Sequence, residues 1–252
     1  MSPPFDPRLH RAGSAELTGR VIAVTGAGDG LGRAVAVDCA RHGASVVLIG
    51  RRQARLEKAL DQIEATHAGS STIAVFDLER AVASDYDQLA KAILERFGRL
   101  DGLLHNAATL GVLSPIECYD VPTWCRVLHV NLTAAFALTR TLLPALKRSP
   151  DASIVFTSSG VGRQARAYWG AYAVSKYGIE GLAQVLAAEL SDITSIRVNT
   201  LNPGRARTSL RLQAYPAEDP ATLPSPESLT GAYLALLGPA SRGVTGGCFD
   251  AQ

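Results

Sequence analysis

Short apolar runs alternate with longer amphipathic stretches along most of this chain. The apolar runs are typical of buried parallel strands and lie at 20–25, 44–49, 72–76, 100–104, 153–158 and 195–201, with a short final strand expected within 243–250. Apolar residues recur at helical spacing between them, at 33–42, 56–65, 86–97, 122–147, 172–190 and 229–237. This alternation predicts an α/β fold, a doubly wound parallel sheet of about seven strands with helices on both faces.

The pattern predicts one dinucleotide-binding and catalytic domain over 19–252, with no repeat or second domain. Residues 1–18 are proline-rich and polar, and we expect a flexible amino-terminal arm there. The segment 209–228 carries Pro216, Pro220, Pro224 and Pro226, which favour a loop with at most a short helix. Because it follows a strand at the edge of the sheet where ligands bind, we predict that it covers the substrate.

Composition argues against several classes of function. The 252 residues are 47% hydrophobic with a net charge of +2, so nothing indicates a nucleic acid or an anionic membrane as a partner. No apolar run approaches the ~20 residues of a membrane span, and the first residues lack the apolar core of a secretion signal. The scattered Cys39, Cys118, Cys125 and Cys248 fit reduced thiols, and no cluster of metal ligands is visible. We therefore predict a cytoplasmic protein without a metal site.

A glycine-rich segment directly follows the first predicted strand and precedes the first predicted helix. In this arrangement backbone amides and the amino end of the helix face an anion, so the segment predicts a phosphate-binding site. The spacing is T-G-x-x-x-G-x-G rather than G-x-G-x-x-G, and a turn that only reverses the chain is the alternative. The predicted dinucleotide contacts are Thr25, Gly26, Gly28, Asp29, Gly30, Leu31 and Gly32.

The end of the second strand indicates which dinucleotide binds. A carboxylate about 20 residues after the glycine turn commonly holds the ribose 2′-hydroxyl of NAD. Here that place holds Arg51 and Arg52, whose guanidinium groups suit a 2′-phosphate. The sequence favours NADP(H) over NAD(H); the alternative is that both arginines are a solvated helix start.

Small or polar residues follow other strands at the same edge of the predicted sheet. Asp77 and Leu78 follow the third strand, and Asp77 either contacts an adenine or caps the next segment. Asn106, Ala107 and Ala108 follow the fourth strand, where small side chains let a cofactor approach the backbone.

Asn131 lies in the middle of the predicted helix 122–147. Asparagine is a weak helix former, so it either satisfies a local backbone kink or a buried water, or it faces solvent. Its position alone does not decide between these alternatives.

The stretch 159–176 carries candidate acid–base chemistry. Tyr172 and Lys176 are four residues apart, so on a helix they share one face and the ammonium lies near the phenol. A nearby cation favours phenolate and lowers the pKa of a tyrosine from about 10 toward the working range. Ser159 follows the fifth strand, at the ligand-binding edge of the sheet. The three groups suit one carbonyl oxygen, although a bare Y-x-x-x-K also occurs by chance on amphipathic helices.

Taken in order, these motifs resemble the short-chain dehydrogenase/reductase family from Gly19 to Phe249. Within it, the stretch VFTSSGVGRQARAYWGAYAVSK and the ending FDAQ resemble the YciK-type subgroup of uncharacterised bacterial oxidoreductases. The resemblance implies a Rossmann-type fold and an enzyme that interconverts a ketone or aldehyde and an alcohol with NAD(P).

The resemblance also implies roles for individual residues. Tyr172 would be the acid–base residue, Ser159 would bind the substrate oxygen, Lys176 would hold the nicotinamide ribose and lower the pKa of the tyrosine, and Asn131 would keep a water in a proton relay. Further cofactor contacts are implied at Asn106, Pro203, Gly204 and Thr208.

Three questions stay open in the sequence. A catalytically idle NADP(H)-binding sensor or scaffold would have the same fold, but it need not keep the residues of the acid–base site. Five arginines near the predicted crevice either select an anionic substrate or form surface and subunit salt bridges. They are Arg163, Arg166, Arg205, Arg207 and Arg211. The helix 172–190 is apolar on more than one face, and the resemblance implies a homo-dimer or tetramer built through 122–148 and 171–190.

Overall fold

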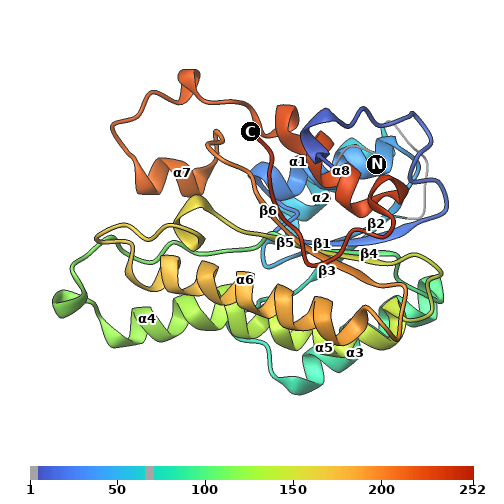
Figure 1. Ribbon diagram of the computed structural model, residues 1–252, viewed down its shortest axis with the longest axis horizontal. Helices are drawn as coiled ribbons and strands as arrows, with labels where there is room; N and C mark the ends of the chain where they lie inside the picture. Colours follow the sequence, from blue (N-terminus) through green and yellow to red (C-terminus); the bar gives the residue numbers. More distant parts are fainter. Residues whose placement is uncertain (1–4, 66–70) are drawn as a thin grey trace.

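The computed structural model describes residues 5–65 and 71–252. Its centre is a seven-stranded parallel sheet in the order β3-β2-β1-β4-β5-β6-β7 (Figure 1). The strands are β1 (Val21–Thr25), β2 (Ser45–Gly50), β3 (Thr72–Val75), β4 (Gly102–His105), β5 (Ser153–Thr157), β6 (Arg197–Asn202) and β7 (Cys248–Asp250). The direction of strand addition reverses between β1 and β4, which is the point where such sheets form a ligand crevice. The predicted doubly wound parallel sheet is confirmed.

Helices cover both faces of the sheet (Figure 1). One face carries α1 (Gly30–Arg41), α2 (Gln53–Glu64) and α8 (Thr230–Leu237), and the other carries α3 (Ala83–Phe97), α5 (Ala134–Leu146) and α6 (Gly170–Leu190). Because successive side chains of a strand point to opposite faces, β1 sends Ile22 and Val24 into one core and Val21 and Ala23 into the other. Burial on both faces explains why β1, β2, β4 and β5 are apolar along most of their length rather than alternating.

The segment before β1 packs on the domain where the structure describes it. Leu17 is fully buried in the core beside α8, and the Phe5 ring meets Phe249 edge-on at 5.5 Å between centroids. The short 3-10 turn Pro7–Leu9 also contacts α8. The structure therefore differs from the expected flexible arm over 5–18, because two isolated apolar residues find partners far along the chain. Residues 1–4 lie outside the described residues.

The predicted helix 122–147 is built from three pieces. It comprises α4 (Val121–Leu128), the π-helical turn η3 (His129–Thr133) and α5. A π turn holds one more residue than an α turn, and such turns occur often at functional sites. Asn131 lies inside it and is 3% exposed, so its side chain does not face solvent.

The segment after β6 contains α7 (Ser209–Ala214) and the 3-10 turns Pro220–Thr222 and Pro226–Leu229. This agrees with the prediction of a loop with a short helix. Figure 1 shows α7 standing apart from the sheet, on the same side of the molecule as the start of α6. In the part of the chain that the structure describes, no helix is both long and apolar enough to cross a membrane.

Ion pairs fasten the edge of the sheet where the strands begin. Asp151, just before β5, pairs with Arg20 before β1, Arg197 at the start of β6 and Arg242 near the carboxyl end. The three nitrogen–oxygen distances are 3.1, 3.0 and 3.1 Å. These ion pairs hold together strands that are far apart in sequence, at the edge where the strands begin. The cavity described below lies at the opposite edge, where the strands end.

Candidate active site

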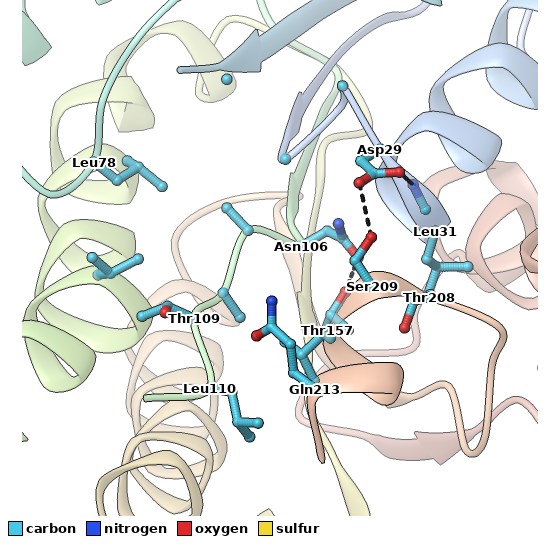
Figure 2. A pocket seen from close by; sticks show the side chains of 18 of the residues that line it. Asp29, Leu31, Leu78, Asn106, Thr109, Leu110, Thr157, Thr208, Ser209 and Gln213 are labelled. Carbon is cyan, nitrogen blue, oxygen red and sulfur yellow. Dashed lines mark hydrogen bonds between the residues drawn. The ribbon is translucent and has the colours of Figure 1, made fainter. Parts of the chain in front are cut away.

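A cavity of about 730 Å³ follows the edge of the sheet where the strands end (Figure 2). It is lined by most of the residues that the sequence selects. These are Gly26, Gly28, Asp29, Gly30, Leu31, Arg51, Arg52, Asp77, Leu78, Asn106, Ala107, Ala108, Ser159, Tyr172, Lys176, Pro203, Gly204 and Thr208. Thr25, Gly32 and Asn131 do not line the cavity, but they contact residues that do.

The glycine turn is shaped by close approaches of the backbone. Gly26 has a φ of +70°, and a Cβ there would lie 3.0 Å from the Cα of Ala107. A Cβ on Gly32 would collide with the Gly26 carbonyl oxygen, so α1 packs directly against the turn. Thr25 lies behind the turn and accepts hydrogen bonds from the N–H groups of Asn106, at 3.0 Å, and Ala107, at 3.1 Å. Thr25 therefore shapes the cavity through the backbone.

Asp29 places a carboxylate in the turn and connects it to two other elements. It accepts hydrogen bonds from the Gly30 N–H at 2.8 Å, from Arg55 on α2 at 2.5 Å and from Ser209 on α7 at 3.1 Å. Figure 2 shows Ser209 approaching the Asp29 side chain across the cavity. Burial alone would raise the pKa of Asp29, but these hydrogen bonds hold it below the usual value.

Three arginines line the cavity beyond the end of β2. Arg51 and Arg52 are exposed, and Arg51 lies 3.8 Å from the Glu79 carboxylate. Sequence reasoning missed Arg55, which lies in the first turn of α2 and lines the same cavity. Asp77 lines the same region and accepts a hydrogen bond from the Glu79 N–H at 3.0 Å, so it also caps the following segment.

Tyr172, in the first turn of α6, is 6% exposed and lines the cavity. Burial raises the pKa of Tyr172 to about 12, and the nearby Ser159 side chain offsets this only in part. The expected lowering of the phenol pKa by Lys176 is absent from this arrangement. The Lys176 ammonium lies 5.7 Å from the centre of the Tyr172 ring, and burial of the phenol sets the direction of the pKa shift.

Lys176 is 3% exposed and donates a hydrogen bond to the Thr157 carbonyl oxygen at 2.7 Å, at the end of β5. Burial lowers the pKa of Lys176 to about 8, while the Glu180 carboxylate one helical turn later favours the charged form. The ammonium is thus fixed between β5 and the tyrosine, and its charge depends on the solution pH near neutrality.

Asn131 joins three parts of the site. Its Oδ1 accepts from the Thr109 N–H at 2.8 Å, and its Nδ2 donates to the Thr109 carbonyl at 2.9 Å and to Ser175 Oγ at 3.0 Å. Ser175 lies on α6 between Tyr172 and Lys176 and donates in turn to the Tyr172 carbonyl at 2.7 Å. Of the alternatives from the sequence, a solvent-facing Asn131 is wrong, because its side chain is buried and satisfies the backbone of Thr109, which is distant in sequence.

Sequence reasoning missed Glu180, a buried carboxylate on the same helix. It accepts hydrogen bonds from Ser158, Thr200, Arg163 and Cys248, and thereby joins β5, β6, β7 and α6. The spacing of four residues from Lys176 was the available signal. Burial alone would raise the pKa of Glu180, but its four donors hold it below the usual value.

The five arginines of the sequence analysis do not converge on the cavity. Arg211 is the member of the set that lines it. Its guanidinium pairs with Glu218 at 2.6 Å and lies 3.8 Å from the centre of the Tyr215 ring. Arg163 pairs with Glu180 at 2.9 Å. Within the described ranges, no group of three or more histidine, cysteine or acidic residues is placed to hold a metal ion.

Comparisons with known proteins agree with this geometry. Residues 20–219 match the family model of the short chain dehydrogenases. The chain is 45% identical over 236 residues to the uncharacterised oxidoreductase YciK of Escherichia coli K12, covering 94% of this chain and 93% of that one. A solved Pseudomonas syringae protein shares 50% identity and a TM-score of 0.95, over 98% of this chain and 99% of its own. An Escherichia coli CFT073 protein solved in complex with NADPH shares 45% identity and a TM-score of 0.92, over 95% and 99%. The chain therefore belongs to the short-chain dehydrogenase/reductase family of oxidoreductases, as its motifs predict, with YciK among its similar relatives.

Proposed function

We propose that this protein is an NADP(H)-dependent oxidoreductase that interconverts a ketone or aldehyde and an alcohol, with Tyr172 as the acid–base residue. The observation that carries the proposal is the placement of Tyr172, Ser159 and Lys176 on one wall of the cavity. The Ser159 side chain lies close enough to the Tyr172 phenol to lower its pKa, and both side chains line the cavity, so both hydroxyls are placed to meet one substrate oxygen.

The residues at the other end of the cavity fit a phosphorylated dinucleotide. The glycine turn brings the amino end of α1 to the cavity, and Arg51, Arg52 and Arg55 supply positive charge beyond β2. The relative that was solved with NADPH covers nearly the whole chain, which supports the same preference here. When bound, NADPH supplies the hydride.

The protein's own groups position the substrate and move the proton. A phenol with a pKa of about 12 is protonated at neutral pH and can donate to the oxygen of a carbonyl as negative charge develops there. Ser159 donates a second hydrogen bond to that oxygen. With the cofactor bound, Lys176 would hold its ribose and return a proton to the tyrosine, while Asn131 fixes the backbone at Thr109.

The decisive experiment compares Tyr172→Phe with Tyr86→Phe, a substitution of a buried tyrosine on α3 outside the cavity. We expect Tyr172→Phe to retain less than about a tenth of wild-type turnover with NADPH and a panel of neutral carbonyl compounds. NADPH affinity should change little, and Tyr86→Phe should behave as the wild type. Turnover by Tyr172→Phe near the wild-type rate would refute the assigned role. NADPH binding without oxidation by any carbonyl compound would instead favour the idle sensor.

We also propose that a second copy of the chain covers the outer faces of α4, α5 and α6. Exposed apolar side chains lie on all three helices, among them Val121, Phe136, Val174 and Val185. Sedimentation measurements that show a monomer at micromolar concentration would refute this assembly.

A further inference from the structure

The cavity wall beside Tyr172 is aromatic and aliphatic. Trp169 packs against Tyr172, with 5.8 Å between ring centroids, and against Tyr215, at 5.9 Å. Leu110 and Leu210 belong to the same apolar cluster and, like Trp169 and Tyr172, line the cavity. Figure 2 shows Leu110 beside the cavity, below Thr109. The acid–base hydroxyl therefore opens onto a surface that favours flat, uncharged carbon skeletons.

Arg211, which lines the cavity near this wall, already has an acidic partner. It makes two hydrogen bonds to Glu218, at 2.6 and 2.7 Å. A substrate carboxylate that bound Arg211 would have to displace Glu218, whereas a neutral ring would leave this ion pair intact.

The backbone holds Trp169 in place by a conformation that few residues adopt. Tyr168 has a φ of +73° and is the one non-glycine residue with positive φ in the described part of the chain. Its carbonyl accepts a hydrogen bond from the Ser114 N–H at 3.0 Å. On the other side of Trp169, a Cβ on Gly170 would collide with the Tyr119 ring. Such conformations persist where the surrounding structure fixes them, and they concentrate at functional sites.

From this geometry we propose that Trp169 is the residue that determines substrate specificity, and that the substrate class is neutral ketones whose carbonyl is attached to or part of a ring. The ring lies against Trp169 and Leu210 while the carbonyl oxygen meets Tyr172 and Ser159. This inference rests on the proposed carbonyl–alcohol activity and names its substrate class.

Steady-state kinetics with NADPH test the proposal through two matched comparisons. Cyclohexanone and hexan-2-one have the same number of carbons and differ in the ring, while acetophenone and 4-acetylbenzoate differ in the charge. We expect kcat/KM to be higher by about tenfold or more for cyclohexanone than for hexan-2-one, and for acetophenone than for 4-acetylbenzoate. Equal values for ring and chain, or a preference for the carboxylate, would overturn the proposal.

Variants test whether the apolar cavity wall causes the preference for ring ketones. Trp169→Ala should lower kcat/KM for cyclohexanone about tenfold or more and for hexan-2-one less than about threefold. Leu210→Ala should act in the same direction, whereas Leu212→Ala, which removes an exposed side chain of α7 outside the cavity, should leave the ratio unchanged. An unchanged ratio in Trp169→Ala would overturn the role of this residue.

A binding measurement separates this inference from the proposed activity. The chain has two tryptophans, so Trp124→Phe leaves Trp169 as the single fluorophore. We expect acetophenone to quench its fluorescence saturably in the presence of NADP⁺, and 4-acetylbenzoate to do so about tenfold more weakly. Quenching without turnover of any ketone would refute the activity and keep the binding preference. Turnover of hexan-2-one without saturable quenching by ring ketones would keep the activity and overturn the preference.

Discussion

Replacing Glu180 by glutamine tests whether the buried carboxylate holds β5, β6 and β7 to α6, the helix that carries Tyr172 and Lys176. Glu180 Oε1 accepts from Ser158 at 2.5 Å and from Arg163 at 2.9 Å, and Oε2 accepts from Thr200 at 2.6 Å. Glutamine has nearly the same shape, but one of its two terminal atoms is an NH₂ group that donates. At that end the protein's donors lose their acceptor, and Arg163 loses its closest counter-charge.

The size of the effect follows from burial. Removing one partner of a buried ion pair costs about 3–5 kcal/mol, and a buried donor without an acceptor costs about 1–3 kcal/mol. The Arg163 side chain is 26% exposed and keeps Asp250 as a partner at 3.1 Å, which reduces the loss. We therefore expect Glu180→Gln to lower the free energy of unfolding by about 2–4 kcal/mol at pH 7.

The pH dependence provides a second check. The pKa of Glu180 is held below its ordinary value of 4.5 in the folded protein, so its contribution to stability is complete above that value. The contribution is lost as the pH falls through the lowered folded-state pKa. The difference between wild type and Glu180→Gln should therefore be largest near neutrality and should shrink below about pH 4.5.

Urea unfolding followed by circular dichroism measures both quantities. The matched control is Glu189→Gln, which makes the same exchange at an exposed position on the same helix and should change stability by less than about 0.5 kcal/mol. Equal urea midpoints for Glu180→Gln and Glu189→Gln at pH 7 would refute the reasoning. A difference in unfolding free energy between wild type and Glu180→Gln that grows toward acidic pH would also refute it.

Three further predictions concern the site. Replacing Arg51 and Arg52 together by alanine should weaken NADPH binding about 10- to 100-fold and NADH binding far less, measured by fluorescence titration; equal losses would contradict a 2′-phosphate site. Asn131→Ala removes both hydrogen bonds to the Thr109 backbone and should lower the free energy of unfolding by about 1–3 kcal/mol together with turnover, whereas unchanged kcat would exclude a role in catalysis. Burial lowers the pKa of Lys176 to about 8, so the ammonium is lost as the pH rises through that value and carbonyl reduction should decline above it. A rate that stays constant up to the ordinary lysine range, about pH 10, would contradict this.

The sheet, its helices and the residues that follow the strands at the cavity could be predicted because they depend on local pattern. Strands buried on both faces leave continuous apolar runs, and the residues that follow these runs meet at one edge of a parallel sheet. The glycine spacing and the interval between Tyr172 and Lys176 each lie within a short stretch of sequence, so both parts of the site could be predicted from it. For the same reason the loop with a short helix after β6 was predictable from its prolines.

Features that depend on distant partners were not predictable. Phe5 packs on Phe249, almost the full chain length away, so the amino-terminal segment has no local signal for its packing. Arg163 was a candidate substrate ligand until the structure showed its pairing with Asp250, 87 residues later. The raised pKa of Tyr172 depends on the extent of burial, which the spacing to Lys176 does not reveal. The side-chain partners of Asn131 in the π turn, Thr109 and Ser175, are likewise distant in sequence.

The shared counter-ion of Arg20, Arg197 and Arg242 has a consequence for redesign. Asp151 fastens three separate segments at the starts of the strands, roughly 17 Å, or one strand of five residues, from the acid–base groups. Loops grafted at the edge where the strands end would leave these ion pairs intact, so the substrate range of the reaction can be altered without destabilising the sheet. A graft that disturbed Asp151 would instead leave three neighbouring arginines at the start of the sheet without their shared counter-ion.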